Sequence, residues 1–204
     1  MTNLARTERH LLADALLQVG PDAPTVCEGW QARHLAAHIV VRDRRPDAAL
    51  AGFVPPLAAH GDRVLQAAAA RPYPELVADV RTAPWWSPVS NTLTDQAANS
   101  GEMFIHHEDV RRAQPGWEPR VLDPAHELAL WKNAKFFARL ALRKHQPVRV
   151  EAPGYGVLQL RDGEPRTTLT APPGELVLFL SGRQRVARVD LTGDDSLRTA
   201  QLGL

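Results

Sequence analysis

The stretch Gly101-Glu102-Met103-Phe104-Ile105-His106-His107-Glu108-Asp109 is the most informative part of this 204-residue chain. In a helix, residues four positions apart lie on the same face, so Glu102 and His106 can reach a single ion. A carboxylate with an imidazole favours zinc, nickel or ferrous iron over calcium or magnesium. The apolar residues between them indicate partial burial, where charged groups need partners. The spacing predicts two metal ligands, and the competing interpretation is a solvated ion pair.

A second pair with the same spacing lies upstream, where His34 and His38 flank three apolar residues. One imidazole from this helix, added to Glu102 and His106, would bind a divalent cation and leave a coordination position open. The two histidines share one helix face, so spacing does not decide between them. Either histidine also has a simpler interpretation as a hydrogen-bonded core residue. The residues therefore leave the third ligand open.

Neighbouring side chains are weaker candidates. Asp109 is expected to accept a hydrogen bond from the His106 imidazole or from the basic end of the His38 helix. His107 points about a quarter-turn away and is a weak candidate for facing a substrate, with an interhelical position as the simpler interpretation. Arg42 is a weak candidate for holding an anionic substrate, the alternative being a solvated helix end.

Glu108 is most simply a solvated charge or a partner for Arg111 or Arg112. Trp85 and Trp86 stand between prolines in a loop, so they are expected to pack over the helices or to line a pocket.

Composition narrows the class of protein. The formal net charge is +1, so no strong field favours nucleic acid or an acidic membrane surface. Cys27 is the single cysteine, and the amino terminus lacks the pattern of a secretion signal, so a cytoplasmic protein is expected. No apolar run approaches the roughly 20 residues of a spanning helix. The expectation is a protein that binds neither nucleic acid nor membrane.

Helical periodicity dominates the first three quarters of the chain. It predicts four long helices, over residues 2–19, 30–45, 94–113 and 123–144, and two shorter ones over 57–70 and 74–80. Past Pro147 the pattern becomes that of short strands around an apolar segment, with a turn at Asp162-Gly163. The period change predicts a helical bundle over residues 1–146 and a small α+β domain over 147–204.

Two motifs carry a resemblance to a known family. One is Val26-Cys27-Glu28-Gly29-Trp30 leading to Leu35-Ala36-Ala37-His38, and the other is Glu102 with His106. With these the chain resembles the DinB-like superfamily, in the branch of mycothiol-dependent maleylpyruvate isomerase and its metal-binding relatives. The resemblance implies a mainly α fold, a DinB-like four-helix bundle with a small α+β C-terminal domain. It also implies His38, Glu102 and His106 as metal ligands and leaves His34 out.

The function that this resemblance implies is thiol chemistry at the metal. We expect a divalent ion, most simply zinc, with nickel or iron as alternatives, and mycothiol as co-substrate for an S-transferase or isomerase acting on a small electrophile. The alternatives are a non-catalytic metal-binding protein and a metal-dependent hydrolase. Arg183, in a Leu-x-Gly-Arg element similar to one in the family's appended domain, is a further weak substrate candidate. A monomer or homodimer is expected.

Overall fold

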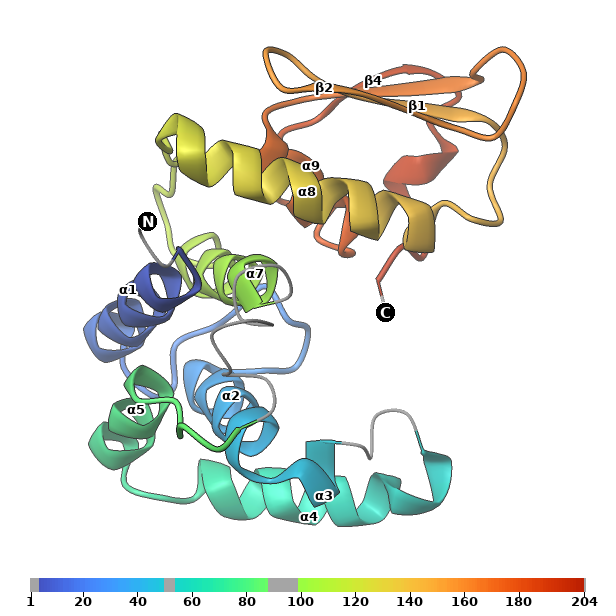
Figure 1. Cartoon of the computed structure of the whole chain (residues 1–204). Coiled ribbons are helices and arrows are strands. Elements are labelled where there is room, and N and C mark those ends of the chain that lie inside the picture. Colours follow the sequence, from blue (N-terminus) through green and yellow to red (C-terminus); the bar gives the residue numbers. More distant parts are fainter. Residues whose placement is uncertain (1–3, 50–53, 88–98, 204) are drawn as a thin grey trace. The chain divides into compact units, whose positions relative to one another are not determined.

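The computed structural model of the chain describes residues 4–49, 54–87 and 99–203 (Figure 1). The chain divides into two compact units, residues 1–118 and 119–204. Among the described residues, no helix is both long enough and apolar enough to cross a membrane.

The first unit is a helical bundle. Its four main helices are α1 (Leu4–Val19), α2 (Ala32–Arg44), α5 (Tyr73–Arg81) and α7 (Ser100–Arg111). The helix α1 packs on α7 and α5, whereas α2 packs on α5 and on α4 (Ala58–Ala69). Two short elements, α3 (Pro46–Ala49) and a 3₁₀ turn η2 (Pro55–Leu57), lie between α2 and α4.

Helical spacing of apolar residues explains these elements. In α1, Leu12 and Leu16 are fully buried, and in α2 Leu35 and Ile39 occupy the same core. Proline cannot continue a preceding helix without strain, and α2 accordingly ends just before Arg45 and Pro46. The predicted helices at 57–70 and 74–80 are confirmed as α4 and α5. The expected start of α7 near residue 94 lies outside the described residues.

Charged residues are also buried inside this bundle. Glu8 of α1 meets His107 of α7, with Oε2 and Nδ1 2.9 Å apart, and both side chains are almost fully buried. On the same helix, Glu108 accepts hydrogen bonds from Arg111 and Arg112. Such pairs must find their partners inside the protein because the bundle excludes water from them.

The second unit combines α8 (Pro124–Ala141), α9 (Pro173–Leu180) and a four-stranded sheet. The strands are β1 (Val148–Ala152), β2 (Gly156–Leu160), β3 (Thr167–Thr170) and β4 (Asp190–Gly193). They are ordered β2-β1-β3-β4, with β1 parallel to β3 and the other pairs antiparallel. A short 3₁₀ turn, η4 (Ser196–Arg198), follows β4. The α+β character of the tail is thereby confirmed.

The helix α8 belongs to this second unit. Asp123 caps it by accepting a hydrogen bond from the His126 N–H at 2.9 Å, and the helix then packs along α9. The structural division therefore falls between residues 118 and 119, whereas the sequence pattern places it at 146/147. The long helix predicted over 123–144 is thus α8 of the second unit, and α5 lies in the first. A period change marks where helices stop, but it does not reveal which helices share a core.

Candidate metal centre

Three possible ligands from two helices converge in the first unit. His38 lies on α2, and Glu102 and His106 lie one turn apart on α7. Glu102 Oε1 is 3.3 Å from His106 Nε2 and 3.9 Å from His38 Nε2. The two imidazole rings meet edge to face, with centroids 5.2 Å apart. One ligand atom of each residue thus lies within 4.8 Å of the others, close enough for all three to reach one ion.

The cluster is open on one side. The side chains of His38 and Glu102 are 35% and 32% exposed, whereas His106 is only 8% exposed. Met103, Phe104 and Ile105 of the same helix are also buried. A small molecule can therefore approach from the side of His38 and Glu102.

The protonation states of Glu102 and His38 suit the binding of a cation. Burial alone would raise the pKa of Glu102, but hydrogen bonds with His106 and His38 and the charge of Arg42 outweigh it and hold the pKa well below its usual value. Burial lowers the pKa of His38 and outweighs its hydrogen bond with Glu102. At neutral pH this pair is therefore a carboxylate and a neutral imidazole, the forms that bind metal ions.

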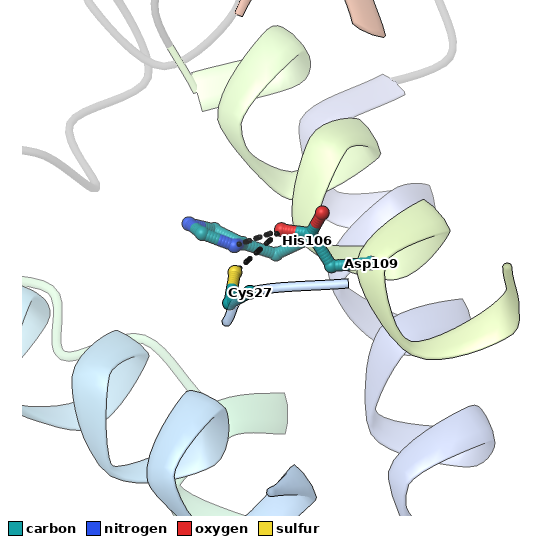
Figure 2. A group of neighbouring side chains, drawn as sticks. All are labelled: Cys27, His106 and Asp109. Atoms are coloured by element: carbon teal, nitrogen blue, oxygen red, sulfur yellow. Dashed lines mark hydrogen bonds and ion pairs between the residues drawn. The ribbon is translucent and has the colours of Figure 1, made fainter. Parts of the chain in front are cut away.

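The other face of His106 contacts a second group of side chains, shown in Figure 2. Its Nδ1 lies 3.0 Å from Asp109 Oδ2, and the Cys27 thiol donates to that same oxygen at 3.2 Å. Burial acts to lower the pKa of His106, but its bonds with Asp109, Cys27 and Glu102 raise it well above the ordinary value. The carboxylates on either side of the ring thus favour its protonated form.

Cys27, His106 and Asp109 are also close enough together to be considered as metal ligands. Their surroundings argue against an exchangeable site there, because the Asp109 side chain has no exposed surface and His106 has almost none. A catalytic metal needs a position for water or substrate. The more accessible group of His38, Glu102 and His106 fits that need better, and Asp109 and Cys27 lie behind it.

The two competing histidines of α2 have different surroundings. The Gln31 N–H donates to His34 Nδ1 at 3.1 Å, so His34 helps to close the first turn of the helix. His38, one turn later, faces Glu102 and His106 instead. The spacing left this choice open, and the contacts favour His38.

The weaker candidate residues also differ in their contacts with the cluster. Arg42 lies beside the cluster, with Nε 3.7 Å from Glu102 Oε1, and it also donates to Asn99 and Asp43. His107 does not face the cluster, because its buried ring is paired with Glu8. Asp109 accepts hydrogen bonds from His106, as predicted, and from Cys27. Glu108 pairs with Arg111 and Arg112, as one interpretation of the spacing predicts.

The loop tryptophans and Arg183 are the remaining candidates. Trp85 is 91% exposed and Trp86 48%, so Trp85 does not pack over the helices. Arg183 belongs to the second unit, where it donates to the Ser181 carbonyl at 2.7 Å. A role for Arg183 in substrate binding stays a prediction.

Two contacts of the cluster were not predicted from the sequence. The Cys27 hydrogen bond to Asp109 joins residues 82 positions apart, and the Trp30 ring packs against His38 with centroids 5.4 Å apart. Both residues come from the Cys-x-Gly-Trp motif, so the motif was visible in the sequence while its contacts were not.

A helical bundle followed by an α+β unit is the DinB-like fold class that the sequence predicts. Residues 4–84 match the family described as Mycothiol maleylpyruvate isomerase N-terminal domain. The resemblance stated from the sequence is confirmed. The match includes His38 and ends before α7.

Solved structures support the fold over most of the chain. A histidine-to-alanine mutant of mycothiol-dependent maleylpyruvate isomerase superposes with a TM-score of 0.60 at 14% identity, covering 94% of this chain and 91% of that one. Another crystal structure of mycothiol-dependent maleylpyruvate isomerase gives a TM-score of 0.56 at 14% identity and the same coverage. At this identity the likeness establishes the fold. No curated protein sequence matches the chain.

Proposed function

We propose that the chain binds one divalent metal ion through His38, Glu102 and His106 and uses it in a thiol-dependent reaction on a small electrophile. The observation that carries the proposal is the convergence of these three residues on a partly exposed face of the bundle. Mycothiol or a similar thiol is the co-substrate, and the reaction is an isomerisation or an S-transfer.

The donor set fits the metal. Two imidazoles and one carboxylate suit zinc, with nickel or ferrous iron as alternatives, and three protein ligands leave at least one position for an exchangeable molecule. When bound, the ion supplies charge that stabilises a thiolate near neutral pH, and the thiolate is the reactive nucleophile.

The residues of the chain prepare this site. Glu102 contributes a negative charge that limits the net charge of the loaded site. Asp109 accepts the Nδ1–H of His106 and so keeps Nε2 available for the ion. Arg42, which already contacts Glu102, can attract an anionic group of a substrate.

The thiol part of the proposal is supported by relatives. The family of residues 4–84 and both solved structures of the same fold are named after mycothiol-dependent maleylpyruvate isomerase. These names describe other proteins, and we extend the thiol dependence to this chain because its metal-ligand set lies in the same fold.

The metal is tested first. Elemental analysis of the purified protein should find one divalent ion per chain, and His38→Ala and His106→Ala should lose it. His34→Gln is the matched control, because glutamine at this position can still cap the helix while it removes the competing histidine. Wild-type metal content in both alanine variants would refute the ligand set, and loss in the control alone would move the ligand to His34.

The chemistry is tested next with the metal-loaded protein. Mycothiol should perturb the visible spectrum of a cobalt-loaded sample and support turnover of at least one electrophile in a broad panel. A metal-loaded protein that does neither would favour a non-catalytic metal-binding function. Hydrolysis of an ester or amide without any thiol would favour the hydrolase.

A further inference from the structure

The loop that precedes α2 connects the two helices that carry the ligands. The Val26 N–H donates to the Asp109 carbonyl oxygen of α7 at 2.9 Å. The Thr25 hydroxyl and the Thr25 N–H both donate to the Trp30 carbonyl, and the Trp30 N–H donates to the Cys27 carbonyl. Gly29 has a φ of +76°, which side chains other than glycine rarely adopt, so the motif's glycine permits this tight turn.

From this turn, Cys27 and Trp30 each contact one side of the cluster. The Cys27 thiol donates to Asp109 Oδ2, the oxygen that also binds Nδ1 of His106 (Figure 2). The Trp30 ring packs against His38, with an angle of 55° between the ring planes. This turn therefore contacts Asp109, which binds His106, and also the ring of His38.

The two helices that carry the ligands pack mainly on other helices. The helix α7 packs mainly on α1, whereas α2 packs mainly on α4 and α5. The two ligand-bearing helices are therefore not each other's main packing partners. A further element that contacts both helices can therefore add to the restraint on the spacing of their ligands.

We propose that the turn Cys27–Trp30 is the positioning element of the metal site, and that Cys27 acts on His106 through Asp109. This inference rests on the proposed metal site. The thiol's hydrogen bond to Oδ2 adds a restraint on the Asp109 carboxylate beside its bond with His106. The restrained carboxylate holds His106 in the tautomer and orientation that present Nε2 to the ion. Trp30 limits rotation of the His38 ring from the other side.

The test is a titration with Co²⁺ alone, followed by visible absorption, on the full chain. Loss of a group that hydrogen-bonds a metal-binding histidine typically lowers metal affinity 10–100-fold. Cys27 contacts His106 only through Asp109, so Cys27→Ala should weaken Co²⁺ binding by about 3–10-fold and shift the cobalt bands. Cys27→Ser can still donate to Asp109 and should restore most of the affinity. Tyr73→Phe is the control, because it removes a hydrogen bond in the same unit away from the site.

A double-variant cycle tests the route through Asp109. In an Asp109→Ala background, Cys27→Ala should cause no further loss of Co²⁺ affinity, because the group through which it acts is gone. A folded Cys27→Ala protein with wild-type affinity and spectrum would overturn the positioning role and leave the metal site intact. Equal losses with and without Asp109 would overturn the route. Absence of Co²⁺ binding by the wild type would overturn the metal site and this inference together.

Discussion

Arg9 and Asp43 form an ion pair inside the bundle, with Nη1 and Oδ2 2.6 Å apart and both side chains almost fully buried. Arg9 also donates to the Val80 carbonyl oxygen at 2.9 Å. One guanidinium thus joins α1 to α2, the helix that carries His38, and to α5.

Removing one partner of this ion pair should lower the stability of the protein. Asp43→Ala leaves the Arg9 charge buried without its counter-ion, and we expect a loss of about 3–5 kcal/mol in the free energy of unfolding, measured with urea. Asp47→Ala is the matched control, since its pair with Arg45 is about half exposed and should contribute much less to stability. Equal losses in the two variants would show that burial does not govern these pairs.

Tyr73 should make the stability of the protein depend on alkaline pH. Its hydroxyl donates to the Leu16 carbonyl oxygen, and burial raises its pKa to about 12. An unfolded chain releases this proton near pH 10, so its contribution is complete below about pH 10 and is lost as the pH rises towards 12.

Tyr73→Phe tests this titration. It should cost about 1 kcal/mol at neutral pH and flatten the decline of stability in the alkaline window, measured as urea midpoints from neutral to alkaline pH. The control is Tyr155→Phe, which removes the chain's other tyrosine. An alkaline decline that persists unchanged in Tyr73→Phe would assign the titration to another group.

The structural division predicts which fragment folds by itself. A fragment of residues 119–204 keeps α8 against the buried helix α9, whereas residues 147–204 leave the apolar surface of α9 uncovered. We expect the longer fragment to give a dispersed amide spectrum and cooperative unfolding, and the shorter one to aggregate or stay unfolded. A well-folded fragment of residues 147–204 would restore the boundary at 146/147.

Metal affinity should rise with pH. The raised pKa of His106 means that a metal ion must displace a proton from this ring, whereas Glu102 is already ionised. Co²⁺ affinity should therefore fall as the pH is lowered from 8 to 6. The buffer takes up the proton released on binding, so the binding heat measured by calorimetry should depend on the ionisation enthalpy of the buffer. The control His34→Gln should show the same pH dependence. Affinity that does not change with pH would contradict the assignment of His106 as a ligand.

The local sequence pattern was enough to predict features whose geometry lies within one helix or strand. The spacing of Glu102 and His106 places them on one face because helical periodicity holds over four residues in any context. The stops at Gly20-Pro21 and before Pro46 follow from backbone sterics, which also act over a few residues. For the same reason the change to strand periodicity past Pro147 was visible in the sequence.

Other features depended on tertiary structure. His34 and His38 share one face of α2, and only the packing of the chain turned one towards the helix cap and the other towards α7. The bond between Cys27 and Asp109, and the place of α8 beside α9, join segments that no local period relates. The sequence by itself determined the helices, the α+β tail and the candidate ligands. Which of these segments meet was decided by burial of apolar surface over the whole chain, because that free energy depends on all contacts at once.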